Sequence, residues 1–464
     1  MRLNLKTILL SASLFLPSLV SAQLASGYTI GPLTTSAAKW AKKVCDVTNY
    51  GAVADGKTDL GPALLAAFNA CASGGVVNIP LGNFAMSTWV TLSGGNAWAI
   101  NLEGVILRTG TAGGHMIVVQ NSTDFEIYSS RSSGAIQGYG YVFHAQGTYG
   151  PRLIRLINVV NFSIHDIALV DSPAFHLILD TVQHGQVYNL IIRGGNEGGL
   201  DGIDVWGFNV HIHDVEITNK DECVTVKNIA IHVHGHGHDA DRTQNPSNHM
   251  LIENIHCNIS GGCAIGSLGA DTAISKITYN NIYSWQSNQM FMIKSNGGSG
   301  SVSDSVFSNF IGHSNAYSLD IDAYWKSTPA TGNGVLYTGL TFSNWKGTCA
   351  DGTLRAPIQV ICPTGQPCAG LSITNFAMWT DTGSYELYKC QNAWGDGGCL
   401  VHGTAHTAYS TVTQTVSSAP SGYSAAKMPN DLAAGYALTA SIPIPTIPTT
   451  FFPGQVPATK RAYP

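Results

Sequence analysis

Asp201, Asp221 and Glu222 are the side chains of this sequence best placed to do chemistry. Asp180, Asp201 and Asp221 follow one another at nearly equal intervals along the chain. If the chain winds in coils of that length, the three aspartates occupy similar positions on successive coils and form a column, with neighbouring strands ~4.8 Å apart. Carboxylates so close repel one another, so at least one should have a raised pKa.

Glycosidic cleavage uses such a group of acids. One protonated carboxylic acid donates to the leaving oxygen, while a carboxylate across the bond activates water or attacks the sugar. A separation of ~5–5.5 Å accompanies retention of anomeric configuration and ~6.5–9.5 Å accompanies inversion, and spacing in the sequence does not choose between them. A calcium site and plain solvated acids are the alternative interpretations.

A repeated unit supplies the coils. Alternating apolar residues surround an Asp or Asn that is followed by another apolar pair, as in Phe-Ser-Ile-His-Asp-Ile-Ala-Leu at 162–169. The steps from 166 to 189, 189 to 214, 254 to 281 and 281 to 309 are similar in length, which is typical of a solenoid whose coils bury their apolar faces by stacking. The units centre on Asp166, Asn189, Asp214, Asn254, Asn281, Asn309, Asn344 and Asn375.

We therefore predict an all-β fold, a single right-handed parallel β-helix. The alternative, an antiparallel sandwich, would show two-residue Asn-Gly or Asp-Gly turns at shorter spacing, and such turns are scarce here. The Asp or Asn is a turn residue between two short strands. The later steps, from 309 to 344 and from 344 to 375, are somewhat longer and continue the pattern.

The step from 214 to 254 is much longer than its neighbours and interrupts the repeat. The excess falls in residues 228–244, where His232, His234, His236 and His238 alternate. Alternating histidines on one strand face could bind a metal. A surface loop or a short retained intron are the other interpretations, and removing the segment restores a regular repeat.

Both ends of the chain look atypical, as solenoid caps must be. We expect a capping helix over Pro62–Ala72, and a Pro, Ser and Thr-rich tail over 417–464 that lies extended along the surface. The predicted catalytic domain is residues 23–416.

Residues 1–22 resemble a cleavable signal peptide. Arg2 and Lys6 precede an apolar stretch, Ile8–Val20, and a small-residue cleavage site precedes Gln23. The product should be secreted, since no other apolar stretch approaches the ~18 residues that a bilayer requires. Charged residues make up 11% and the net charge is −5, so the chain lacks the basic field needed for nucleic acid or anionic membranes.

Ten cysteines and the secretory route favour four pairs close in sequence. These are Cys45 with Cys71, Cys223 with Cys257, Cys362 with Cys368, and Cys390 with Cys399. Cys263 and Cys349 are left over. Glycosylation sequons begin at Asn121, Asn161 and Asn258.

Four short motifs resemble those of the polygalacturonase superfamily, glycoside hydrolase family 28. That family carries Asn-Thr-Asp, Asp-Asp, Gly-His-Gly before Ile-Gly-Ser, and Arg-Ile-Lys. The matching places read Gly-Leu-Asp (199–201), Asp-Glu (221–222), Gly-Gly-Cys-Ala before Ile-Gly-Ser (261–267), and Met-Ile-Lys (292–294). The missing histidine and arginine favour its rhamnogalacturonase branch. The Gly-His-Gly at 235–237 lies inside the interruption with no Ile-Gly-Ser after it.

The resemblance implies hydrolysis of the galacturonate-to-rhamnose bond of rhamnogalacturonan, endo-acting and with inversion. It implies that Asp221 donates the proton and that Asp201 and Glu222 hold and deprotonate water. Lys294 would bind the galacturonate carboxylate, and His313 is a further candidate in the cleft, although a surface turn histidine explains it nearly as well. The remaining candidates are Asp180 and Asp204, which would tune pKa values or bind sugar hydroxyls, and Tyr317 and Trp325, which would stack on sugars or simply serve the core.

Three other functions compete with this one: an endo-polygalacturonase, a pectin or pectate lyase, and an inactive polysaccharide-binding β-helix. A lyase would need calcium or an arginine base and would release unsaturated ends. We expect a monomer without cofactor or metal, whose partner is the pectic polysaccharide.

Overall fold

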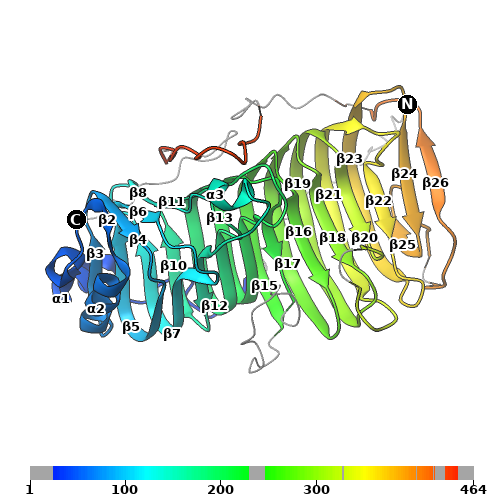
Figure 1. Cartoon of the computed structure of the whole chain (residues 1–464). Coiled ribbons are helices and arrows are strands. Elements are labelled where there is room, and N and C mark those ends of the chain that lie inside the picture. The colour runs from blue at the N-terminus through cyan, green and yellow to red at the C-terminus, as the bar shows by residue number, and fades with distance from the viewer. Residues whose placement is uncertain are drawn as a thin grey trace, which may run out of the picture.

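The computed structural model describes residues 24–228, 246–326, 329–403, 405–421, 423 and 434–447. Its strands wind as successive coils into one elongated stack, from the blue N-terminal end to the orange C-terminal end (Figure 1). Strands of neighbouring coils pair in parallel with one another. Near the C-terminal end, β24 also pairs with β26, and this pairing is antiparallel. The predicted parallel β-helix is confirmed.

The strands of the first half lie before Asp221 and Glu222 in the chain. They are β1 (Val44–Asp46), β2 (Asp55–Asp59), β3 (Val76–Ile79), β4 (Asn83–Met86), β5 (Val90–Leu102), β6 (Val105–Arg108), β7 (His115–Tyr128), β8 (Gly134–Gln137), β9 (Arg152–Ile157), β10 (Val160–His165), β11 (Ile167–Val170), β12 (Leu177–Arg193) and β13 (Ile203–Thr218).

The later strands continue the same winding. They are β14 (Glu222–Val226), β15 (Ser247–Asn258), β16 (Gly262–Leu268), β17 (Thr272–Trp285), β18 (Gln289–Ser295), β19 (Gly300–Asn315), β20 (Tyr317–Asp322), β21 (Leu336–Asp351), β22 (Ile358–Ile361), β23 (Cys368–Thr382), β24 (Glu386–Gln391), β25 (Ala393–Asp396) and β26 (Val412–Val416).

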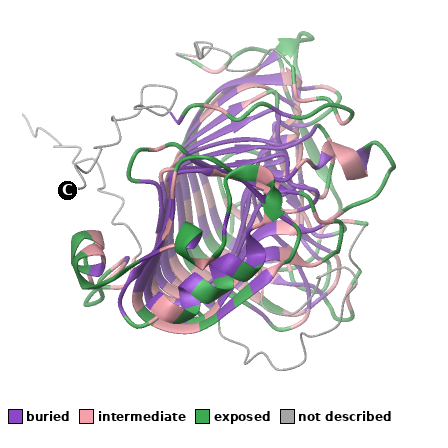
Figure 2. Cartoon of the chain, turned by 60° about the vertical axis from the view of Figure 1, so that its left-hand side comes forward, coloured by how far each residue is buried: buried purple, intermediate pink, exposed green. Residues whose placement is uncertain are grey.

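The core fills the inside of the coils. Alternate residues of each strand point inward, so Ile, Val, Leu and Phe side chains stack on equivalent residues of the next coil. Phe310 stacks on Trp345 with ring centroids 4.0 Å apart, and Phe307 lies 4.9 Å from Phe342. Figure 2 shows buried residues lining the strands, with exposed ones gathered on helices and connections.

The repeated Asp or Asn sits at a bend inside each coil. All eight have a positive φ, from 50° at Asn375 to 60° at Asn344, a conformation that Asn and Asp tolerate better than other residues with a side chain. Their side chains also bond from coil to coil. The Asn281 amide donates to Asn254 Oδ1 at 2.8 Å, and the Asn254 amide donates to Asp214 Oδ1 at 3.1 Å. The repeat residue is therefore the turn-former that the sequence predicts.

Short helical elements lie in the N-terminal part of the chain. They are α1 (Ser36–Lys42), the 3₁₀ turn η1 (Val47–Tyr50) and α2 (Gly61–Cys71), with α3 (Tyr141–His144) further along. The expected helix at 62–72 thus appears as α2. Its Leu64 and Phe68 are buried against the first coils, and Phe68 packs on Trp98 with ring centroids 4.7 Å apart.

Residues 434–447, which belong to the predicted tail, lie against the outside of the coils. Ile442 packs with Ala168 and Val170, and its carbonyl accepts a hydrogen bond of 2.7 Å from Gln137 Nε2. Ile447 packs on Ile191. The predicted signal peptide lies outside the described residues, as does the His-rich interruption except for Asn228.

All four predicted disulfides form: Cys45–Cys71, Cys223–Cys257, Cys362–Cys368 and Cys390–Cys399. Cys263 and Cys349 are free and buried, as expected of the leftover pair. None of the helices within the described ranges is both long and apolar enough to cross a membrane.

The three sequons differ in their surroundings. Asn121 is exposed, so a glycan there would project into solvent. The Asn161 amide nitrogen already donates to the carbonyl of Thr29 at 3.0 Å. Asn258 is 1% exposed and its amide donates to Thr218 Oγ1, so a glycan on this nitrogen does not fit the folded chain.

The turn residues give a stability prediction. Replacing Asn281 with Ala should lower the free energy of unfolding by about 2 kcal/mol, because Ala tolerates the positive φ poorly and the bond to Asn254 is lost. Asn281→Gly, which accepts the backbone conformation, should lose less. Chemical denaturation of both variants measures the difference, and equal losses would show that backbone conformation contributes nothing.

Candidate active site

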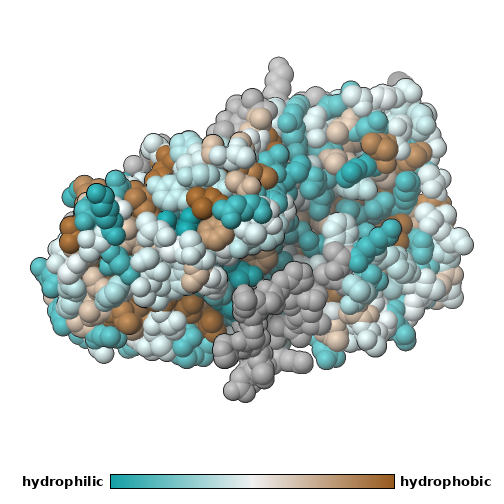
Figure 3. All heavy atoms as spheres, in the orientation of Figure 1, coloured by the Kyte–Doolittle hydropathy of each residue, from teal (hydrophilic) through white to brown (hydrophobic). Residues whose placement is uncertain are grey.

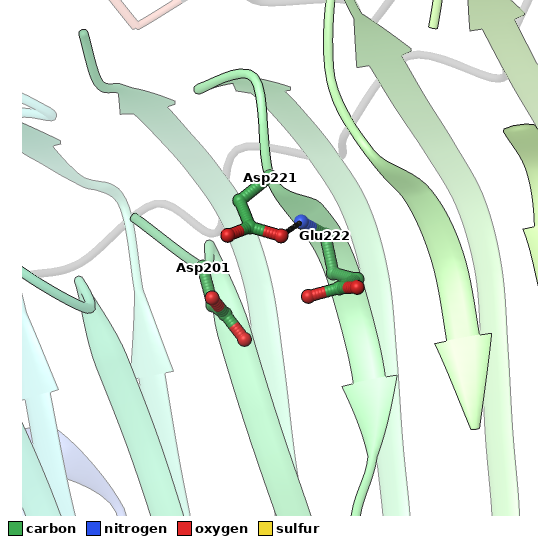
Figure 4. Close-up of side chains that lie close together, drawn as sticks. All are labelled: Asp201, Asp221 and Glu222. Atoms are coloured by element: carbon green, nitrogen blue, oxygen red, sulfur yellow. Dashed lines mark hydrogen bonds between the residues drawn. The ribbon is translucent and has the colours of Figure 1, made fainter. Parts of the chain in front are cut away.

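Asp201, Asp221 and Glu222 converge where two neighbouring coils begin the same strand. Asp201 lies just before β13, and Asp221 and Glu222 lie where β14 begins. One carboxylate oxygen from each residue lies within 4.8 Å of one from each of the others. Figure 4 shows the three side chains turned toward a common space. The sequence-predicted acids are thus brought together.

The column of stacked acids differs from the predicted one. Ile203 is the register partner of Val224, so two positions earlier on both coils Asp201 is aligned with Glu222. Glu222, rather than Asp221, therefore stacks on Asp201, and Asp221 sits one position earlier. Its Oδ1 accepts from the Glu222 backbone N–H at 2.9 Å, and its Oδ2 accepts from Gly199 N–H.

Asp180 does not belong to this column, which corrects the expectation from spacing. It lies inside β12 and pairs in register with Trp206, which lies well inside β13 and beyond Asp201. Its carboxylate is fully buried and forms an ion pair of 2.5 Å with Arg155. The interval from Asp180 to Asp201 misleads because coil lengths vary, so equal spacing in sequence does not give equal position on the coil.

Two lysines form ion pairs with the acids. Lys227, which follows β14, places its Nζ 3.2 Å from Asp201 Oδ2 and 3.3 Å from Asp204 Oδ1. Lys294, on β18 two coils further along, donates from Nζ to Glu222 Oε1. Sequence reasoning identified Lys294 but missed Lys227. Lys227 follows Thr225, the register partner of Asp204, by two positions and so shares its strand face, and this register is known only from the structure.

Asp221 and Asp201 have raised pKa values. Burial, followed by the negative charges of Glu222 and Asp201, raises the pKa of Asp221 well above that of a free aspartate. The two backbone N–H donors favour the charged form but do not outweigh these effects, because two carboxylates stand so near. Burial also raises the pKa of Asp201, against the opposing attraction of Lys227. Of the two, Asp221 therefore holds a proton more readily than Asp201.

Glu222 shows the opposite behaviour. Burial would raise its pKa, but the positive charges of Lys294 and Lys227 together lower it below that of a free glutamate. Burial likewise acts to lower the pKa of each lysine, and the surrounding carboxylates raise it instead. The pKa values of Glu222 and Asp221 are thus shifted in opposite directions, which is the difference expected of a carboxylate and an acid that work as a pair.

Asp204 is the buried fourth acid. Burial and the charge of Asp201 raise its pKa well above the usual value, and Lys227 opposes them. Asp204 is 3% exposed and shares Lys227 with Asp201. It therefore acts on the site through Asp201 and Lys227, and its placement fits the pKa-tuning role expected from the sequence.

The three converging carboxylates have the composition of a cation site. Oxygen ligands of this type suit calcium or magnesium, which was one interpretation of the sequence. Here the ammonium groups of Lys227 and Lys294 already supply the positive charge, one on Asp201 and one on Glu222. A bound cation would face both lysines at close range, so these residues fit a metal poorly.

The other candidates lie further along the stack. The ring of His313 stacks on Trp285 with centroids 4.0 Å apart, three coils beyond Thr218. At ~4.8 Å per coil this is roughly 14 Å from the strand line of the acids. His313 therefore stays a prediction from the sequence, since no described contact joins it to the acids.

Aromatic rings nevertheless lie on this side of the stack. Tyr317 begins β20 and carries the Arg355 guanidinium over its ring, 5.1 Å from the centroid. Trp325 lies 5.6 Å from Lys294 Nζ, so it borders the lysine that contacts Glu222. Of the two candidate platforms, Trp325 is the one next to the acids.

Comparison with known proteins gives the same assignment as the motifs. The profile described as "Glycosyl hydrolases family 28" matches residues 85–399, more than half of the chain. The chain is 58% identical over 459 residues to "Probable rhamnogalacturonase B" of Aspergillus fumigatus, covering 98% of this chain and 84% of that protein. It is 57% identical over 443 residues to "Rhamnogalacturonase A" of Aspergillus aculeatus, covering 95% and 96%.

Solved structures resemble the fold at lower identity. The endo-xylogalacturonan hydrolase of Aspergillus tubingensis matches with a TM-score of 0.60 at 22% identity, over 74% of this chain and 94% of that one. The polygalacturonase of Erwinia carotovora ssp. carotovora matches with a TM-score of 0.55 at 18% identity, over 77% and 96%. The family profile and the near full-length relatives together show that the chain belongs to the glycosyl hydrolases of family 28.

Proposed function

We propose that this family 28 glycosidase hydrolyses the α-galacturonate-(1→2)-α-rhamnose bond of the rhamnogalacturonan backbone, acting within the polymer. The observation that carries the proposal is the carboxylate cluster, in which Asp221 has a raised pKa and Glu222 a lowered one within 4.8 Å. The choice of polymer rests on the relatives named rhamnogalacturonase, which align over nearly the whole chain. Cys263 in place of the histidine of polygalacturonases supports the same choice.

Asp221 donates the proton to the leaving rhamnose oxygen. Its environment favours the protonated form, and it is less buried than Asp201 and Glu222, so a substrate oxygen can reach it. After donation its negative charge is stabilised by the N–H groups of Gly199 and Glu222. The donors that bond to its carboxylate are thus already in place for the charged product state.

Asp201 and Glu222 hold the attacking water between them. Asp201, with the raised pKa of the pair, is the better proton acceptor, whereas Glu222 remains ionised and orients the water and stabilises positive charge on the sugar. The oxygens lie closer together than the ~6.5–9.5 Å usual for an inverting pair. We infer inversion nonetheless, because the resemblance of the motifs to those of rhamnogalacturonases implies it, and a water held by the two stacked carboxylates would be the nucleophile.

The lysines and outer residues complete the site. Lys294 has three N–H donors, of which one reaches Glu222, leaving others for a galacturonate carboxylate. Trp325 beside it offers a ring face to a sugar. Asp180 lies two coils before Lys227 along the line Asp180, Trp206, Lys227, and its partner Arg155 lies one coil earlier still, so the pair lies away from the cleaved bond.

The full biological setting is an inference of the same kind. We propose that residues 1–22 are removed on secretion. Residues 23–416 then form the single catalytic domain, a right-handed β-helix capped by α2. Residues 417–464 form its extended tail. The enzyme acts outside the cell as a monomer. Its molecular surface suits a hydrophilic polymer, because the face seen in Figure 3 is mostly hydrophilic and is hollowed across its middle.

Asp221→Asn should lower kcat on rhamnogalacturonan by about 10²-fold or more, because the leaving oxygen loses its proton donor. Binding of the polymer should persist. Release of reducing ends is measured on rhamnogalacturonan and homogalacturonan, with exposed Asp271→Asn as the matched control. Release from homogalacturonan alone would make the enzyme a polygalacturonase, unsaturated product absorbing in the ultraviolet would make it a lyase, and no release would leave a binding protein.

Lys227 should set the acidic limb of the pH profile. Activity needs Asp201 ionised and Asp221 protonated, so kcat/KM rises through the pKa of Asp201 and falls at higher pH through that of Asp221. Lys227→Met removes a cation 3.2 Å from Asp201, so the pKa of Asp201 rises and the acidic limb moves up by about one pH unit or more. Lys227→Arg should restore it. An unmoved limb in folded Lys227→Met would refute the role.

The anomeric form of the first product tests the water mechanism. Inversion at an α-linked galacturonate gives the β anomer at the new reducing end. Proton NMR during the first minutes of hydrolysis, before mutarotation, should therefore show the β signal growing first. Early growth of the α signal would instead identify Asp201 or Glu222 as a nucleophile that forms a covalent intermediate.

A further inference from the structure

A separate pocket opens at the N-terminal end of the stack, between α1 and the turns that follow β3, β5 and β7. Its volume is about 590 Å³, within the range of sites for small ligands. Its lining includes Trp40, Asn78, Asn101, Glu103, Ser130 and Arg131. Register steps from Tyr128 through His165 and Tyr188 to His213 place it three or more coils from the coil that carries Asp221.

The outer wall of the pocket is α1, and it is fastened to the coils. A helix as short as α1 is not stable alone, so tertiary contacts must hold it. Lys39 is buried and pairs with Glu126 at 3.3 Å and Asp124 at 3.5 Å. Ser36 adds a hydrogen bond of 3.2 Å to Glu126. The wall is therefore preformed, which lowers the entropic cost of binding.

Trp40 is the aromatic surface of the pocket. Its ring packs against the buried cluster of Val76, Ala99 and Tyr128, and its Nε1 donates to Tyr128 Oη at 2.5 Å. The ring is nevertheless only partly buried and lines the pocket. A rigid indole with one side packed and part of its surface open is the platform on which a pyranose ring stacks.

Polar groups beside Trp40 are held in a line across the coils. The Asn101 amide donates to Asn78 Oδ1 at 2.9 Å, and the Asn78 amide donates to Asp46 at 2.7 Å. Each amide group retains a second N–H that these bonds do not use. Sugar hydroxyls are suitable acceptors for them. The two asparagines thus form a fixed polar edge to the pocket.

Two charged side chains line the pocket, Glu103 and Arg131. Glu103 is satisfied internally, because its oxygens accept from the hydroxyls of Ser129, Ser130 and Ser133 and from the Ser130 N–H. Arg131 is exposed and has neither an ion pair nor a hydrogen bond with any other residue that the structure describes. Its five donors are free for a carboxylate, which a guanidinium binds through two parallel bonds.

We propose that this pocket is a second carbohydrate site that binds a uronate-bearing segment of the polysaccharide. Trp40 stacks on a sugar ring, the amides of Asn78 and Asn101 donate to hydroxyls, and Arg131 pairs with the uronate carboxylate. The identity of the polymer rests on the proposed function. A polymer held here and at the carboxylate cluster gains effective concentration at the active site, whereas a short fragment gains nothing.

The site is tested by calorimetric titration of the full chain carrying Asp221→Asn, with rhamnogalacturonan oligosaccharides as the probe. We expect two binding events in this protein and one after adding Trp40→Ala or Arg131→Ala, with about tenfold weaker binding or more at the lost site. Lys57→Ala, which removes another exposed cation from the N-terminal coils, is the matched control and should leave both events. Because Arg131 is exposed, its variant should fold even if Trp40→Ala does not.

Kinetics of the active enzyme separate this site from the catalytic one. Arg131→Ala should raise KM for the polymer and leave kcat/KM for short oligosaccharides unchanged. A single binding event in the Asp221→Asn protein, or equal binding of neutral galactan oligosaccharides, would overturn the proposal. If homogalacturonan oligosaccharides fill the pocket while rhamnogalacturonan is not cleaved, the proposed substrate fails and the second site stands.

Discussion

Backbone hydrogen bonds between successive coils decide which residues of this chain are neighbours. Each strand pairs in parallel with the strand one coil away, so residues one coil apart in the sequence, such as Ile203 with Val224 and Ile274 with Val302, come within ~4.8 Å. The core, the asparagine bonds and the carboxylate cluster all follow from this stacking.

The carboxylate cluster is tolerated because lysines from two other places on the stack reach it. Asp201, Asp204 and Glu222 are buried, and burial alone would keep them all neutral. Lys294 acts on Glu222, whereas Lys227 divides its charge between Asp201 and Asp204. This unequal distribution of positive charge lowers the pKa of Glu222, whereas the pKa of Asp221, which has no lysine partner of its own among the described residues, is raised.

The segment before β1 shows how charge also organises the outside of the stack. Leu33 and Thr34 donate their backbone N–H groups to Asp124, and Lys39 lies buried between Asp124 and Glu126. These bonds fix a stretch that buries little apolar surface of its own. These contacts also hold α1 in place as the outer wall of the pocket beside Trp40. One segment therefore both attaches to the coils and forms part of the proposed binding surface.

Much of the fold and part of the site were readable in the sequence, whereas the tertiary structure decided what spacing could not. The recurring Asp and Asn residues predict coils, because each marks a bend that few other side chains tolerate, and the four cysteine pairs were predicted correctly. Only the strand register shows that Glu222 stacks on Asp201 and that Asp180 instead pairs with Arg155. Lys227 and Lys294 are far apart in the chain yet face one cluster. Local conformation follows from each residue's own backbone preferences, whereas the partner of a buried charge depends on how many residues every intervening coil contains.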